Sequence, residues 1–127
     1  MVTVSDLMTK TLVTVPVGTS TADAAKVMNK RQVGSVFIEQ NNRVVGIVTE
    51  SDIVRKVVGE NKPVHCVSVE SIMSSPVISL DERRSITDAA DLMQSHHTRH
   101  LGVVQSGAII GVLSVRDLLQ PVAIDEF

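Results

Sequence analysis

The stretch GIVTESD runs from Gly46 to Asp52, and the chain returns to the same phrase as GVLSVRD between Gly111 and Asp117. Each copy begins with a glycine inside an apolar run and places a hydroxyl residue three positions before an aspartate. A shift of 65 residues superimposes the copies and aligns residues 4–57 with residues 69–122 without a gap. So long a match indicates an internal duplication, and we therefore expect two copies of one structural unit.

Both repeats are predicted to contain a short helical turn, a strand, a helix, a β-hairpin and a last short helix. Ser20 and Ser85 are expected to be the N-caps of the longer helices, because a serine side chain accepts from the free amides of the first turn. The apolar stripes predicted for these helices are Ala22, Ala25 and Met28 in the first repeat, and Ile86, Ala89, Ala90 and Met93 in the second. The other predicted elements are helical turns at 7–8 and 72–73, strands at 12–15 and 77–80, hairpins with strands at 35–39, 43–49, 101–105 and 108–114, and last helices following Asp52 and Asp117, the second ended by Pro121.

The composition excludes several classes of function. The formal net charge is −2, and there is no Trp or Tyr and only two Phe, so neither phosphate-backbone binding nor base stacking is expected. No apolar run approaches the roughly 18 residues of a membrane helix, and MVTVSDLMTK does not have the pattern of a signal peptide. We therefore expect a cytoplasmic protein that binds neither nucleic acid nor membrane. The single Cys66 excludes an intrachain disulfide framework.

The predicted organisation is a first repeat at residues 1–59, a linker at 60–68 and a second repeat at 69–127, which together form one module of the α+β class. A β-α-β-β-α unit of about 55 residues is small for an independent hydrophobic core. Two such units that share a core are therefore the expected solution.

The paired repeats, each of which closes with G-h-x-S/T-x-x-D, resemble the CBS (cystathionine β-synthase) domain family. Two copies of the phrase in register, each preceded by DLM or SIM and by a T-x-x-V or P-x-x-S strand, are specific, and the resemblance covers nearly the whole chain. It implies a tandem CBS pair packed with pseudo-twofold symmetry, with two clefts between the repeats. It also implies binding of an adenosine compound such as AMP, ADP, ATP or S-adenosylmethionine, association into a homodimer, and a regulatory role.

The repeated phrase has a chemistry that suits such a ligand. An ionised Asp can accept hydrogen bonds from both hydroxyls of a ribose, and charge-assisted bonds are the stronger kind. A phosphate suits the Thr or Ser hydroxyl and the amides of the following helix, whereas adenine suits an apolar slot.

The resemblance, carried over by position, implies two ligand sites. The first would use Ile47, Thr49, Ser51 and Asp52, faced by Pro76, Ile78, Thr98, Arg99, His100 and Gly102. The second would use Val112, Ser114, Arg116 and Asp117, faced by Thr11, Val13, Val33, Gly34 and Ser35. Because Arg99 and His100 stand where the family often carries basic phosphate ligands, the first site is predicted to be the stronger one for phosphorylated ligands.

Three other interpretations compete with the ligand site. Thr49 and Asp52 have the spacing of a helix capping box, as do Ser114 and Asp117, and a cap is compatible with ligand binding. His96 and His100 have the i, i+4 spacing of zinc ligands, but a helix end expected between them argues against a metal site. His65 and Cys66 lack a third group to orient them, so no catalytic residue is expected.

The sequence thus predicts a regulatory sensor of adenosine nucleotides, without a resident cofactor and without enzymatic activity, that acts in trans on a protein partner. The alternative is a ligand-free scaffold for dimerisation or interaction, with vestigial clefts. The identity of the adenosine ligand, the use of one cleft or both, the partner and the orientation of the dimer stay open at this point.

Overall fold

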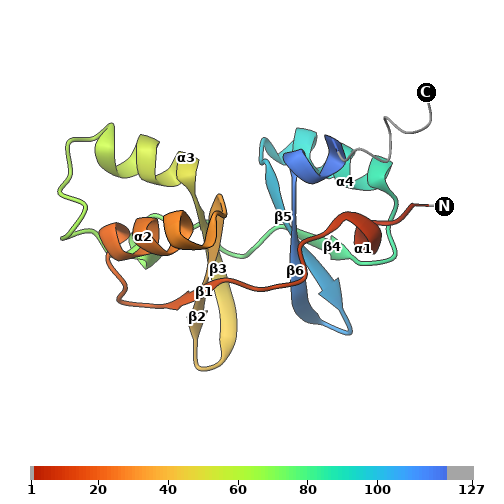
Figure 1. The fold of residues 1–127 in the computed structure, drawn as a ribbon, viewed down its shortest axis with the longest axis horizontal. Coiled ribbons are helices and arrows are strands. Elements are labelled where there is room, and N and C mark those ends of the chain that lie inside the picture. Colours follow the sequence, from red (N-terminus) through yellow and green to blue (C-terminus); the bar gives the residue numbers. More distant parts are fainter. Residues whose placement is uncertain (1, 120–127) are drawn as a thin grey trace. The chain divides into compact units, whose positions relative to one another are not determined.

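The computed structural model describes residues 2–119 of the 127-residue chain, and both repeats have the predicted β-α-β-β-α order (Figure 1). The first half contains α1 (Val4–Leu7), β1 (Thr14–Pro16), α2 (Thr21–Arg31), β2 (Ser35–Gln40), β3 (Arg43–Thr49), α3 (Glu50–Ile53) and the π-helical η1 (Val54–Val58). The second half contains the 3-10 helix η2 (Val69–Ser71), β4 (Ser79–Asp81), α4 (Ile86–His96), β5 (His100–Gln105), β6 (Ala108–Ser114) and the 3-10 helix η3 (Val115–Leu119). This mixture of two three-stranded sheets and helices confirms the α+β class.

The two sheets have the same topology. β1 pairs in parallel with β2, which pairs antiparallel with β3, and β4, β5 and β6 repeat this arrangement. Asn41 and Asn42 both have positive φ, as do Ser106 and Gly107. Positive φ at both central residues matches the right-handed twist of the flanking strands, so the predicted hairpin turns are confirmed.

The longer helices begin at the predicted caps. Ser20 Oγ accepts from the Asp23 amide at 3.0 Å, and Ser85 Oγ accepts from the Asp88 amide at 3.0 Å. Both helices end at a residue in the left-handed conformation, Gln32 in α2 and His97 in α4. A left-handed residue terminates a helix by turning the chain away from its axis.

The short elements differ from the prediction by one to three residues. The first strands are β1 and β4, at 14–16 and 79–81, the residues whose registered ladder partners lie on β2 and β5. The helical turns lie at 4–7 and 69–71, before the predicted positions. The last helices begin at Glu50 and Val115, ahead of the aspartates, and the predicted stop at Pro121 lies outside the described residues.

Most of the buried hydrophobic residues form two clusters, one around each sheet. The first cluster consists of Val13, Val15, Ala24, Met28, Val36, Ile38, Val48, Val57, Val69 and Ile72, and the second of Val4, Ala89, Met93, Leu101, Val103 and Leu113. Ala24 and Ala89 are fully buried, and their small side chains let α2 and α4 approach the strands closely. The predicted place of Ala90 in the apolar stripe is wrong, because Ala90 is exposed and Leu92 packs against the cluster instead.

The chain folds as two compact units whose boundaries fall inside the repeats. The first unit comprises residues 13–77, and the described part of the second unit comprises residues 2–12 and 78–119. The leading segment of each repeat therefore packs on the hairpin of the other repeat. Ser74 exchanges backbone hydrogen bonds with Ile47 at 2.9 and 3.1 Å, and Thr9 exchanges them with Val112 at 2.9 and 3.0 Å.

The glycine that opens each repeated phrase makes room for this leading segment. A Cβ on Gly111 would stand 2.7 Å from the Thr9 carbonyl oxygen and 2.9 Å from Met8 Sδ. A Cβ on Gly46 would meet the sulfur of Met73 and would lie 3.0 Å from the Ser74 carbonyl oxygen. Any side chain at either position would push the leading segment away from the hairpin.

We expect Gly111→Ala to lower the free energy of unfolding by about 1–3 kcal/mol, the range typical of overpacking. Gly46→Ala is expected to cost less, because the nearest obstacle there is the flexible Met73 side chain rather than a backbone oxygen. Urea denaturation of both variants beside the unmodified protein measures the two losses. A Gly46→Ala variant that is destabilised as much as Gly111→Ala would contradict this explanation.

Candidate functional site

Each repeated phrase places its hydroxyl residue and its aspartate in a helix cap where an edge strand of the sheet ends. Thr49 follows β3, and its amide and hydroxyl donate to Asp52 Oδ2 at 2.9 and 3.2 Å, while the Asp52 amide donates to Thr49 Oγ1 at 3.3 Å. In the second unit, the Ser114 amide and hydroxyl donate to Asp117 Oδ2 at 2.8 and 3.2 Å. In the first unit the hydroxyl and the carboxylate each satisfy an amide that the helix start would otherwise leave without a partner, and in the second unit the Asp117 carboxylate satisfies the Ser114 amide.

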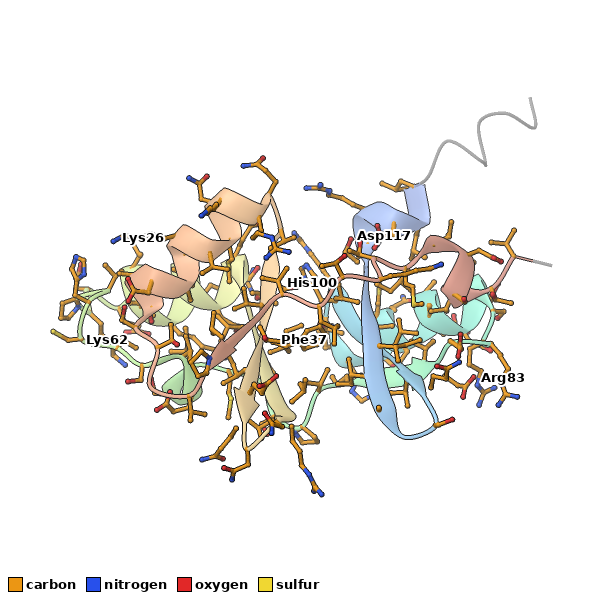
Figure 2. All side chains as sticks on the ribbon, turned by 60° about the horizontal axis from the view of Figure 1, so that its bottom comes forward. Lys26, Phe37, Lys62, Arg83, His100 and Asp117 are labelled. Carbon is orange, nitrogen blue, oxygen red and sulfur yellow. The ribbon has the colours of Figure 1, made fainter. Side chains whose placement is uncertain are left out.

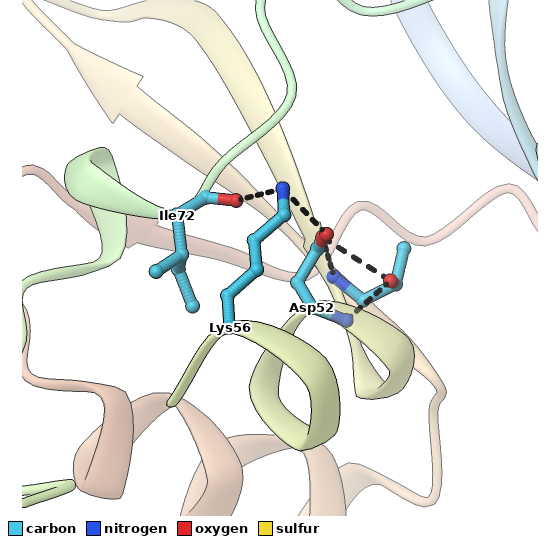
Figure 3. A network of polar contacts seen from close by, with 4 residues as sticks. Asp52, Lys56 and Ile72 are labelled. Carbon is cyan, nitrogen blue, oxygen red and sulfur yellow. Dashed lines mark hydrogen bonds and ion pairs between the residues drawn. The ribbon is translucent and has the colours of Figure 1, made fainter. Parts of the chain in front are cut away.

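The second carboxylate oxygen of Asp52 is also engaged. Lys56 Nζ lies 3.0 Å from Asp52 Oδ1 and donates to the Ile72 carbonyl oxygen at 2.9 Å (Figure 3). The Asp52 side chain is only 14% exposed, whereas that of Lys56 is 48% exposed. Lys56 therefore connects the carboxylate to the segment that pairs with β3 through Ser74.

Asp117 has no equivalent cation. It lies where β6 gives way to η3 (Figure 2), and within residues 2–119 no Lys or Arg side chain pairs with it. The position that matches Lys56 in the second repeat is Pro121, and residues 120–127 contain no Lys, Arg or His. Its neighbour Arg116 is exposed. The two aspartates thus make the same kind of cap, but only Asp52 forms an ion pair within the described part of the chain.

The loop before the first hairpin strand lies beside the capping box in each unit. In the first unit, the Glu50 amide donates to the Gly34 carbonyl oxygen at 3.0 Å, and Ser35 pairs with Thr49 across the ladder. In the second unit, the Val115 amide donates to the Arg99 carbonyl oxygen at 2.9 Å, and His100 pairs with Ser114. One polar strand end therefore carries Gly34 and Ser35, and the other carries Arg99 and His100.

The residues predicted for each ligand site are divided between the two units, so each group is described in its own unit. The first unit holds Val13, Val33, Gly34, Ser35, Ile47, Thr49, Ser51, Asp52 and Pro76, of which Ser51 and Pro76 are exposed and Val13, Ser35 and Ile47 are buried. The second unit holds Thr11, Ile78, Thr98, Arg99, His100, Gly102, Val112, Ser114, Arg116 and Asp117, of which Thr11, Arg99 and Arg116 are exposed and Gly102 is buried. Thr98 Oγ1 donates to the His100 carbonyl oxygen at 3.1 Å, and the Gly102 amide donates to the Ile78 carbonyl oxygen at 2.9 Å.

Two residues near these positions were missed by the sequence analysis. Lys56 follows Asp52 at i, i+4, a spacing that favours an ion pair on a helix and that could have been noticed. Phe37 is 2% exposed in β2 at the position that Gly102 occupies in β5. Because side chains alternate along a strand, Phe37 lies on the face opposite Val36 and Ile38 of the first cluster, and the two repeats differ there by a whole aromatic ring.

The competing features lie where the sequence analysis expected them. His96 is the last residue of α4, His97 is its left-handed cap and His100 opens β5, so a helix end separates His96 from His100. Within the described part of the chain, no three His, Cys, Asp or Glu side chains are arranged to hold a metal ion. None of the helices between residues 2 and 119 is both long and apolar enough to cross a membrane.

The two capping boxes predict unequal contributions to stability. Asp52→Ala removes two cap bonds and the partner of Lys56, so we expect the free energy of unfolding to fall by about 1–2 kcal/mol. Asp117→Ala removes the cap alone and is expected to cost about 1 kcal/mol. Asp23→Ala is the matched control, because Asp23 is exposed and lies 3.9 Å from Lys26. Urea denaturation in which Asp52→Ala behaves like Asp23→Ala would contradict the role of the cap.

The comparisons with known proteins agree with the duplicated architecture. The family model described as CBS domain matches residues 4–59 and 69–123. A 17.7 kDa protein of Acidianus ambivalens is 38% identical over 117 residues, which cover 91% of this chain and 70% of that protein. The chain spans only 62% and 56% of the length of two further archaeal relatives.

Solved structures with the same fold include two CBS proteins whose descriptions bear on function. A CBS domain protein from Pyrobaculum aerophilum, in complex with AMP, is 28% identical with a TM-score of 0.85 and covers 98% of this chain and 97% of its own. A hexameric CBS-CP12 protein from bloom-forming cyanobacteria is 27% identical with a TM-score of 0.90 and covers 99% of this chain and 74% of its own. Since the family model matches both repeats, this chain belongs to the CBS domain family as a tandem pair.

Proposed function

We propose that this chain is a regulatory module that binds an adenosine nucleotide and acts on a protein partner. The observation that carries the proposal is the pair of oriented carboxylates, Asp52 and Asp117, fixed by the same cap at the same strand end in both repeats. A related protein of nearly the same length is described in complex with AMP, which supports adenosine as the ligand class.

The carboxylates suit the ribose of such a ligand. A carboxylate offers about four lone-pair positions, and the cap uses only Oδ2, so an aspartate can serve as a cap and as an acceptor for hydroxyls at once. Because the cap fixes the side chain before binding, little rotamer entropy is lost when the ligand arrives. This favours Asp52 and Asp117 as the ribose acceptors in our proposal.

Basic side chains near the end of β6, in the second unit, suit the phosphate. Arg99 is exposed beside the Val115 amide, and Arg116 is exposed next to Asp117. Arginine presents a planar group of donors that matches phosphate oxygens. That the site containing Asp52, Arg99 and His100 binds phosphorylated ligands more strongly stays a prediction, as does the homodimer. Oligomers do occur in the family, since a cyanobacterial CBS protein is hexameric.

Regulation requires that the ligand bind two conformations of the module with different affinity, because a ligand with equal affinity shifts no equilibrium. A scaffold without a ligand is the second candidate. It is favoured by the capping boxes themselves, which give both repeated phrases a structural role that needs no nucleotide.

Calorimetric titration with AMP, ATP and S-adenosylmethionine distinguishes the two functions. We expect at least one of the three to bind, and Asp52→Ala or Asp117→Ala to weaken that binding about tenfold to a hundredfold, the effect of losing a charged hydrogen-bonding group of about 1.5–3 kcal/mol. Asp23→Ala and Asp88→Ala change the charge equally at exposed helix starts and should leave the affinity unchanged.

Absence of binding of all three nucleotides to the unmodified protein would support the scaffold. Loss of affinity in Asp23→Ala equal to that in Asp52→Ala would indicate a general effect of charge rather than a ribose contact.

A further inference from the structure

Lys56 occupies the carboxylate oxygen that a ribose at Asp52 would need. Asp52 Oδ2 already accepts from the amide and hydroxyl of Thr49, and Lys56 Nζ holds Oδ1 at 3.0 Å. A ribose diol donates two hydrogens, and an aspartate whose Oδ2 serves the cap can accept them together only on Oδ1. We infer that Lys56 is a specificity-determining residue that competes with the ribose for Asp52. This inference rests on the proposed function.

The competition is specific to the first repeat. The position equivalent to Lys56 is Pro121, and no Lys or Arg within residues 2–119 pairs with Asp117. Among the described residues, Asp117 Oδ1 has neither a hydrogen-bond nor an ion-pair partner, whereas Asp52 Oδ1 forms an ion pair with Lys56. Asp117 is therefore available to a ribose without rearrangement, whereas Asp52 must first release the Lys56 ammonium.

A ligand can displace the Lys56 ammonium from Asp52 at a small cost in free energy. The Lys56 side chain is 48% exposed, and ion pairs with an exposed partner are weak because water screens them. The ammonium also keeps its bond to the Ile72 carbonyl oxygen, 2.9 Å away, when the carboxylate turns to another donor. Lys56 therefore lowers the affinity at Asp52 without blocking it.

The same contact connects the carboxylate to the leading segment of the second repeat. Ile72 is buried in the first cluster, and Ser74, two residues further on, pairs with Ile47 of β3. The Ile72 carbonyl oxygen therefore orients the Lys56 ammonium toward Asp52 from the leading segment (Figure 3).

The test measures AMP affinity by calorimetry in the Asp117→Asn background, so that Asp52 alone reports. We expect Lys56→Met, which keeps the apolar stem, to raise the affinity for AMP about two- to fivefold, the scale of an exposed ion pair. The gain should be smaller for 2′-deoxy-AMP, because its single hydroxyl needs only one acceptor position. A purely structural role for Lys56 would lower affinity or leave it unchanged, so the gain separates the two roles.

Arg55→Met is the matched control. Arg55 is exposed, precedes Lys56 directly and has no ion pair within residues 2–119, so its loss reproduces the change in charge without touching Asp52. We expect Arg55→Met to show no gain and Lys56→Arg to retain the unmodified affinity. Thermal unfolding of each variant confirms that it is folded at the temperature of the titration.

The outcomes separate this inference from the proposed function. If the unmodified protein binds AMP but Lys56→Met matches Arg55→Met, the inference is overturned and the proposed function stands. Binding that is undetectable in the Asp117→Asn background and appears with Lys56→Met supports the inference. No binding of AMP, ATP or S-adenosylmethionine to the unmodified protein or to any variant overturns both.

Discussion

The backbone pairing of each leading segment with the hairpin of the other repeat is the constraint on which both units depend. It carries Val69 and Ile72 into the first cluster and Val4 into the second. The pairing is possible only because a glycine opens each repeated phrase, since the segment passes within contact of that backbone. The stretch that fixes the fold is therefore the stretch that ends, six residues later, in the candidate ribose acceptor.

In our proposal, each aspartate has both a structural role as a helix cap and a role in binding the ligand. A capping box uses one carboxylate oxygen and fixes the rotamer, and the other oxygen keeps its ability to accept hydrogen bonds. If the proposal holds, stability and ligand affinity depend on the same side chain. The two repeats then diverge through their neighbours, Lys56 and Phe37 in one and Pro121 and Gly102 in the other.

The features that could be predicted from the sequence are those whose physical cause is local. Hairpin turns at Asn41–Asn42 and Ser106–Gly107 and the caps at Ser20 and Ser85 depend on a few consecutive residues, and each of them was predicted. The exchange of leading segments was not predicted, because it pairs residues far apart in the chain and leaves no local pattern. The hydrogen bond from Lys56 to the Ile72 carbonyl oxygen was not predicted for the same reason. The ion pair of Lys56 with Asp52, four residues earlier, could have been predicted from their spacing.

Because the leading segments are exchanged, the two units can complete their folding at different stages of synthesis. The first unit is one continuous stretch, and 27 residues separate Ile47 from its partner Ser74. The second unit needs Thr9 to find Val112, which is 103 residues later, and closing a longer loop costs more entropy and slows folding. As the chain leaves the ribosome, residues 13–77 can close on themselves at once. Residues 2–12 emerge before that unit but acquire their partners only after the hairpin that contains Val112 has been synthesised.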